Sequence, residues 1–216
     1  MHPAARQSAA MYLWAGIALL VVGFVCLGID RRAVHYIYDN VSARQHQMLD
    51  SITHLAKAAH WLVAAILIYG VARLVRLFYL HDPWVFIAQD AALAFIASLA
   101  MGSLILHILK RLIGRRRPRD EIEMHLYEFK FWTFKADYNS FPSGHALTIF
   151  SVAAIATCVF PSLAAVWFVI AITLSATRVL LTAHFVSDVL IGAGMGLIST
   201  HIILIHFFER FAPHWV

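Results

Sequence analysis

A histidine and an aspartate in the last third of the chain have a spacing that suits catalysis. His184 and Asp188 lie in the stretch TRVLLTAHFVSD, where one helix could place the carboxylate against the imidazole ring. A carboxylate on one ring nitrogen fixes the tautomer and leaves the other nitrogen free to attack. Arg178 lies six residues before His184, which is the wrong spacing for one helical face. We therefore expect a break near Thr182–His184 that brings Arg178 and His184 together.

A second group of residues could bind an anion. Lys110 and Arg117 are seven residues apart, so a helix would carry both on one face. Pro118 disfavours a helical conformation at Arg117, which predicts that the helix ends there. The planar guanidinium and the compact ammonium group make a clamp for phosphate oxygens. The same run is also typical of a solvated face or a lipid-headgroup contact, because it is dense in arginine: Arg115, Arg116, Arg117 and Arg119.

The stretch FPSGH supplies a third group at the start of an apolar run. Pro142 interrupts the preceding segment, and Ser143 is a suitable cap for the helix that follows. Gly144 lets backbone approach a ligand closely, and the first helical amides favour an anion. His145 would then lie beside that anion. The competing interpretation is a plain helix cap with a histidine at the membrane interface.

The elements that must position these residues are membrane helices. The 216 residues are 61% hydrophobic and 13% charged, against about 25% charged in soluble domains, and the mean hydropathy is +0.73. The net charge of +5 is unevenly placed. Cys26 and Cys158 lie in apolar runs and provide neither a disulfide framework nor metal-binding spacing. We expect one all-α integral membrane bundle.

Six apolar segments are long enough to be membrane helices, and none alternates as barrel strands do. We read the first as an uncleaved helix rather than a signal peptide. The six segments are Met11–Ile29, Ile52–Leu80, Trp84–Ile113, Ser143–Phe160, Ser162–Leu181 and Phe185–Phe208.

Six crossings place both termini on one side and gather the polar groups described above on a single face. Polar groups within or beside a bilayer are costly and usually functional. The face collects Lys110, Arg117, Ser143, His145, Arg178, His184 and Asp188.

These three motifs, in this order, resemble the type 2 phosphatidic acid phosphatase superfamily, which includes bacterial acid phosphatases and vanadium haloperoxidases. They read K-x-x-x-x-x-x-R-P from Lys110, P-S-G-H from Pro142, and R-x-x-x-x-x-H-x-x-x-D from Arg178. The third motif usually opens with Ser-Arg, whereas this chain has Thr177 and keeps a hydroxyl. The resemblance extends from the third to the sixth segment. With six segments, the chain looks like the membrane lipid-phosphatase branch.

The resemblance implies a mechanism without metal or cofactor. His184 attacks phosphorus and forms a phosphohistidine, Asp188 orients His184, and His145 protonates the leaving oxygen and then activates water. Cationic side chains and a helix start stabilise the phosphoryl charge, which phosphoryl transfer mainly needs. The phosphate-binding residues implied are Lys110, Arg117, Ser143, Gly144 and Arg178.

Other functions compete with this one. A lipid-to-lipid phosphotransferase would use the same site, and a vanadate-dependent oxidoreductase is a weaker alternative because those relatives are soluble. A transporter should place polar groups near mid-membrane, whereas here they collect at one edge.

The chain has 13 histidines, which could in principle bind zinc. The three cations Lys110, Arg117 and Arg178 would repel a zinc ion, which argues against such a site. The residues His54, Lys57 and His60 are either interfacial or grip a headgroup. The aromatic segment Leu126–Tyr138 is either a surface anchor or shapes access to the site.

We expect a single membrane domain over residues 1–216, with a catalytic core at 84–208 and the loop 114–142 at the catalytic face. The expected substrate is a phospholipid or isoprenoid-lipid phosphate, such as phosphatidylglycerophosphate, phosphatidic acid, polyprenyl pyrophosphate or a lipid A phosphate. The expected partners are the membrane and this lipid, with no nucleic acid, and the oligomeric state is left open. The positive-inside rule, applied directly, puts the site in the cytoplasm. Bacterial relatives of the resembled family generally work on the outer face, so we expect a bacterial inner-membrane enzyme with a site facing the periplasm or exterior.

Overall fold

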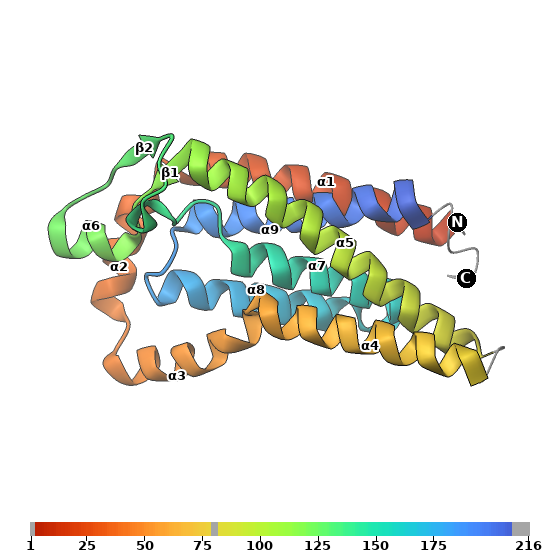
Figure 1. Ribbon diagram of the computed structural model, residues 1–216. Coiled ribbons are helices and arrows are strands. Elements are labelled where there is room, and N and C mark those ends of the chain that lie inside the picture. The colour runs from red at the N-terminus through yellow and green to blue at the C-terminus, as the bar shows by residue number, and fades with distance from the viewer. Residues whose placement is uncertain (1–2, 79–81, 209–216) are drawn as a thin grey trace.

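The apolar runs form helices in the computed structural model, which describes residues 3–78 and 82–208 (Figure 1). Each of the six expected segments overlaps one of six helices. The second begins six residues later than expected, and the last two residues of that predicted segment, Tyr79 and Leu80, lie outside the described residues. The six helices are α1 (Pro3–Cys26), α4 (Ala58–Phe78), α5 (Pro83–Leu112), α7 (Gly144–Val159), α8 (Ala164–Leu180) and α9 (Val186–Ile203).

Length and apolarity distinguish these helices from one another. Among residues 3–78 and 82–208, four helical stretches are long and apolar enough to cross a membrane: Ala43–Phe78, Pro83–Leu112, Pro161–Leu180 and Val186–His206. A fifth is formed if the bent pair Ala10–Cys26 and Asp30–Asn40 makes one span. The α7 helix is also apolar but has 16 residues, fewer than the roughly 20 that a full crossing needs. The described part of the chain is therefore a mostly helical membrane bundle with four to five spans by length.

The short α7 helix forms the centre of the bundle. Its residues from Ala146 to Ile155 are all buried, and it packs against α5, α8 and α9. A glycine permits the approach of α9, since a Cβ atom on Gly192 would lie 2.2 Å from the carbonyl oxygen of Ser143. The start of α7 is therefore fixed by backbone contact with α9.

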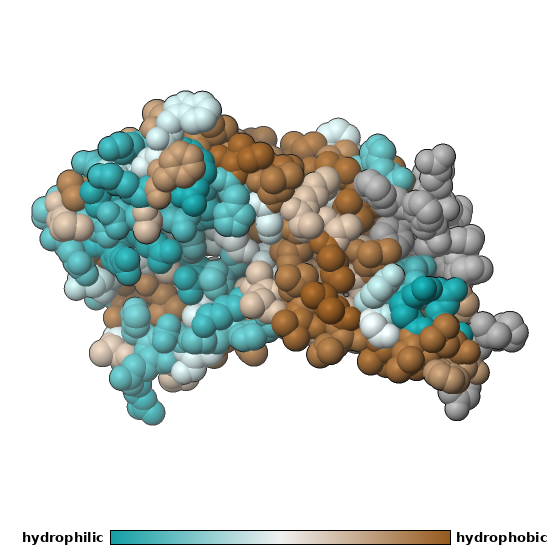
Figure 2. All heavy atoms as spheres, in the orientation of Figure 1, coloured by the Kyte–Doolittle hydropathy of each residue, from teal (hydrophilic) through white to brown (hydrophobic). Residues whose placement is uncertain are grey.

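Most of the remaining elements lie at one end of the bundle (Figure 1), where hydrophilic residues gather, while hydrophobic residues cover its middle (Figure 2). The chain turns by 83° between α1 and the next helix. The two helices that follow this bend were not predicted from the sequence. The elements at this end are α2 (Asp30–Asn40), α3 (Ala43–Thr53), η1 (His54–Ala56), β1 (Ile113–Arg115), α6 (Pro118–Met124), β2 (Phe129–Phe131) and η2 (Ala136–Tyr138). Two further short turns, η3 (Pro161–Leu163) and the π-helical η4 (Leu204–Phe208), precede α8 and follow α9.

The prediction that one helix carries Lys110 and Arg117 is wrong. The α5 helix ends at Leu112, and the chain continues as β1, which pairs antiparallel with β2. Gly114 lies opposite Lys130 in this sheet, and a Cβ atom there would approach the Lys130 carbonyl oxygen to 2.7 Å. The long-range pairing with β2 therefore ends the helix several residues before the proline would.

Candidate active site

A tight turn between α8 and α9 places His184 beside Arg178, as the sequence predicted. The α8 helix ends at Leu180, and Thr182 has a left-handed backbone conformation with φ of 50°. The backbone amide of His184 then donates to the carbonyl oxygen of Arg178 at 3.1 Å. The break in the helix therefore places His184 next to the end of α8, the helix that carries Arg178.

The ring of His184 has a partner that the sequence analysis missed. Its Nδ1 lies 2.8 Å from the backbone carbonyl oxygen of Ser140, whereas the nearer carboxylate oxygen of Asp188 is 3.8 Å away. A carbonyl oxygen can accept but never donate, so Nδ1 carries the hydrogen and Nε2 keeps its lone pair. Asp188 therefore acts on the His184 ring mainly as a nearby negative charge, and the carbonyl oxygen of Ser140 makes the shorter hydrogen bond. In the sequence, the only indication of a role for Ser140 was its position directly before the stretch FPSGH.

The carboxylate of Asp188 is completely buried and held by three donors. Oδ2 accepts from the hydroxyl of Ser140 at 2.6 Å and from the backbone amide of Phe185 at 3.0 Å. Oδ1 accepts from Nη1 of Arg115 at 2.7 Å. Ser140 therefore contacts both members of the predicted pair, through its carbonyl oxygen to His184 and its hydroxyl to Asp188.

The second motif begins α7 as expected and contacts the third. The hydroxyl of Ser143 caps the helix by accepting from the amide of Ala146 at 3.5 Å. The backbone amide of Ser143 donates to the carbonyl oxygen of Asp188 at 3.0 Å. A Cβ atom on Gly144 would meet no protein atom nearer than 3.9 Å, so this glycine leaves open space at the helix start. An anion at that point would meet the positive end of α7.

Three cations lie near these residues: Arg117 and Arg178 interact electrostatically with His145 in the first turn of α7, and Lys110 interacts with His184. Lys110 is buried, and its Nζ donates to the carbonyl oxygen of Asn139 at 2.7 Å. Arg178 donates from Nη1 to the hydroxyl of Thr53 at 3.0 Å, while its buried Nε has no acceptor among the described residues. Arg117 is close enough to interact electrostatically with Lys110, Arg178 and His145. Like charges gathered in this way require an anion to offset their repulsion.

The ionisation of His184 suits a nucleophile. Burial lowers the pKa of His184, and although Asp188 favours the charged ring, Lys110 and Arg178 lower the pKa further. The ring is therefore neutral at neutral pH.

We expect His184 to react with diethyl pyrocarbonate, which modifies neutral imidazole, at pH values where an ordinary histidine is mostly protonated. The midpoint of its reaction rate against pH should lie below about 6.5, the ordinary value. Mass spectrometry of the modified peptide measures this, with a short histidine peptide in the same sample as the reference. A midpoint at or above that of the peptide would contradict the assignment of a neutral ring.

Across the described ranges 3–78 and 82–208, no group of three or more His, Cys, Asp or Glu side chains has the geometry of a metal site. The charged groups that converge at the start of α7 are mainly cations. The site as built is therefore suited to an anion.

Apolar helices with cations and a histidine at one end define an integral membrane protein with an anion site. The model of the PAP2 superfamily matches residues 91–212, more than half of the chain, and the chain belongs to this superfamily. All three predicted motifs lie within the matched residues. The resemblance inferred from the sequence is therefore confirmed at the level of the superfamily.

Two curated relatives are lipid A 1-phosphatases. The protein from Rhizobium etli is 34% identical over 99 residues, which cover 46% of this chain and 43% of the relative. The protein from Rhizobium johnstonii is 33% identical over 99 residues, which cover 46% of this chain and 41% of the relative. The matched region thus spans less than half the length of either relative.

Two solved structures share the fold. LpxE of Aquifex aeolicus superposes with a TM-score of 0.58 at 17% identity, covering 82% of this chain and 96% of that one. The first transmembrane PAP2 type phosphatidylglycerolphosphate phosphatase of Bacillus subtilis gives a TM-score of 0.59 at 19% identity, covering 93% and 98%. At these identities the likeness concerns the fold.

Proposed function

We propose that this chain is a metal-independent membrane phosphatase that removes a terminal phosphate from a lipid phosphate or pyrophosphate. One observation carries the proposal: Nδ1 of His184 lies 2.8 Å from the carbonyl oxygen of Ser140, which leaves Nε2 without a hydrogen, and the cations Lys110 and Arg178 are near enough to act on the ring electrostatically. Membership in the PAP2 superfamily and the lipid A 1-phosphatase relatives support a lipid substrate.

The proposed reaction proceeds through a phosphohistidine. Nε2 of His184 attacks phosphorus as the ester P–O bond breaks, and His145 donates a proton to the leaving oxygen. The phosphorylated ring is then cationic, and the Asp188 carboxylate, 3.8 Å from Nδ1, stabilises that charge. Water next attacks phosphorus, gives a proton to His145, and releases phosphate from His184.

In this mechanism the phosphoryl oxygens are held by cationic side chains and by the start of α7, without a metal ion. Three cationic side chains and the start of α7 stabilise the charge that spreads over those oxygens in the transition state. The proposed phosphate-binding residues are Lys110, Arg117, Ser143, Gly144 and Arg178.

We propose that six helices cross the membrane, including α7. Because α7 is surrounded by α5, α8 and α9, it needs less length than a helix that faces lipid. The proposed location is the bacterial inner membrane, with the site facing the periplasm or exterior. The proposed catalytic core is residues 84–208, with the segment 114–142 at the catalytic face.

The test is phosphate release by the purified protein from four lipids: a lipid A bisphosphate, phosphatidic acid, phosphatidylglycerophosphate and a polyprenyl pyrophosphate. We expect release from at least one of them, unchanged by EDTA. The same reactions with an added lipid alcohol distinguish a phosphotransferase, which would form a new lipid phosphate instead of free phosphate. Loss of activity in EDTA, or no release from any lipid, would overturn the proposal.

A further inference from the structure

Behind the proposed catalytic residues lies a buried guanidinium that the sequence motifs do not include. Arg115, in β1, has 1% of its surface exposed. Its Nη1 donates to Asp188 at 2.7 Å and to the hydroxyl of Ser187 at 2.8 Å. Its Nη2 donates to Asp30 at 2.8 Å and to the hydroxyl of Tyr127 at 2.7 Å. One cation is therefore shared between two buried carboxylates.

The second carboxylate comes from a distant part of the chain. Asp30 begins α2, directly after the 83° bend, and lies outside residues 91–212 that match the superfamily. It is completely buried. Its Oδ1 accepts from the backbone amide of Ser187 at 3.1 Å, and its Oδ2 accepts from the Ser187 hydroxyl and from Arg115. Asp30 thus contacts the first turn of α9, next to Asp188.

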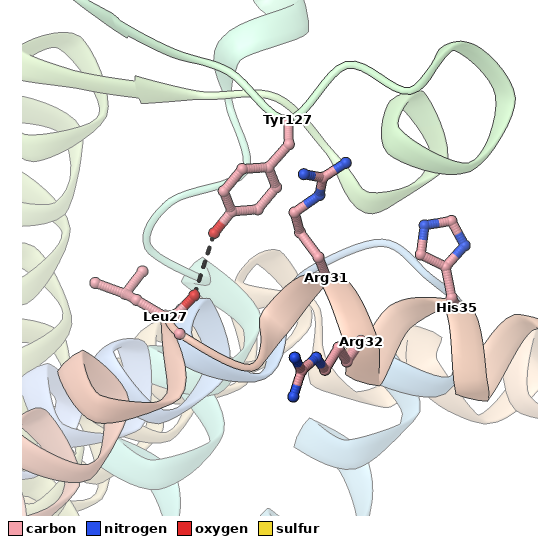
Figure 3. Close-up of a pocket in the computed structure, with 6 residues that line it drawn as sticks. Leu27, Arg31, Arg32, His35 and Tyr127 are labelled. Carbon is pink, nitrogen blue, oxygen red and sulfur yellow. Dashed lines mark hydrogen bonds between the residues drawn. The ribbon is translucent and has the colours of Figure 1, made fainter.

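Aromatic rings restrict the guanidinium to this position. Arg115 lies over the ring of Phe185, 3.8 Å from its centroid, and 5.1 Å from the centroid of Tyr127. The Tyr127 hydroxyl donates to the carbonyl oxygen of Leu27 at 3.4 Å, which ties the segment before β2 to the α1–α2 bend (Figure 3). Arg115 therefore has little freedom to move, and the bend helps to set its place.

The number of charges matters for the reaction. A guanidinium bound to Asp188 alone would offset most of the negative charge that stabilises a phosphorylated, cationic His184. Asp30 binds the other side of the same guanidinium and restores a net negative charge to the buried group. A charge without a partner is costly to bury, so the two carboxylates and Arg115 depend on one another.

We infer that Asp30 is a positioning residue for the proposed phosphatase reaction: acting through Arg115 and Ser187, it fixes the orientation and charge of Asp188 beside His184. This inference rests on the proposed function. It adds to the active site a residue that none of the three motifs contains.

The test compares Asp30→Asn with Asp39→Asn, which changes an exposed aspartate on the same helix. With a lipid that the wild type hydrolyses, Asp30→Asn should lower kcat at least about tenfold and leave KM within about twofold, because lost positioning acts on the transition state. Vanadate, which mimics the transferring phosphoryl group, should bind more weakly by a similar factor, while inorganic phosphate should bind as before. Asp39→Asn should match the wild type in all four measurements.

A purely structural role would give a different result. Asp30→Asn would then lower the melting temperature and the folded fraction, but the folded enzyme would keep the kcat of Asp39→Asn, and the inference would be overturned. If Asp30→Asn does not fold, Ser187→Ala decides, since it keeps both carboxylates and removes the hydroxyl between Arg115 and Asp30. A Ser187→Ala enzyme with lower kcat and unchanged KM supports the inference, and one with wild-type kcat overturns it. A wild type that neither releases phosphate nor binds vanadate would instead overturn the proposed function, and the inference with it.

Discussion

Replacing His184 by alanine is expected to lower phosphate release at least about 1000-fold, because the substitution removes the atom that attacks phosphorus in the proposed mechanism. The remaining cations and the start of α7 would still bind the lipid phosphate, so KM should change much less than kcat. Phosphate release from the best lipid in the panel measures both. His46→Ala is the matched control, since His46 is an exposed histidine on α3.

Trapping the intermediate gives an independent measurement of the same prediction. Wild-type enzyme quenched during turnover should carry a phosphate that is stable in alkali and released by acid, and peptide mapping should place it on His184. The His184→Ala variant should carry none. A labelled residue other than His184, or a variant that retains most of its turnover, would show that another group attacks phosphorus.

Substituting Gly192 by alanine should damage the fold and the site together. The new Cβ atom would lie 2.2 Å from the carbonyl oxygen of Ser143, which is a backbone atom and cannot rotate away. The α7 and α9 helices must then separate at the point where Ser143 donates to Asp188. Overpacking of this kind costs about 3 kcal/mol or more, and we expect the apparent Tm to fall by roughly 6 °C or more. Misplacement of the α7 start should also reduce kcat/KM by about 100-fold.

Gly70→Ala provides the control for this substitution. Gly70 lies within α4, and a Cβ atom there would meet nothing within 4 Å. Alanine is a better helix former than glycine, so the apparent Tm should stay the same or rise. Thermal unfolding in one detergent, followed for both variants, separates the steric effect at Gly192 from any general cost of replacing a helical glycine. Equal Tm values for the two variants would contradict the close packing of α7 on α9.

The long helices were predictable from the sequence because a run of apolar residues needs no tertiary information to indicate a membrane helix. The bend after Cys26 and the helices α2 and α3 were not, because they are amphipathic and polar and depend on contacts with α6, α8 and α9. The end of α5 was misplaced for a related reason. Pro118 sets the latest residue at which the helix can end, whereas pairing of Gly114 with Lys130 makes it end earlier.

The site was predictable where spacing within one segment carries the information. The break at Thr182 follows from the mismatch between Arg178 and His184, and the Ser143 cap follows from local preference. The partners of the proposed catalytic pair, His184 and Asp188, come from distant segments, so no spacing reveals them. Arg115 was one of several adjacent arginines, and Asp30 is 158 positions from Asp188.

The length of α7 bears on how a lipid would reach the site. Sixteen residues rise about 24 Å, less than the roughly 30 Å thickness of the hydrocarbon core. If the far end of α7 reaches the opposite interface, its first amides are recessed by several ångströms beneath the plane of the headgroups. A substrate phosphate would have to move below the hydrated headgroup layer to reach these amides. The charges of Lys110, Arg117 and Arg178 would then compensate for the hydration that the phosphate loses. The protein would then favour lipids whose phosphate sits directly above the acyl chains over those that carry it on a long polar stalk.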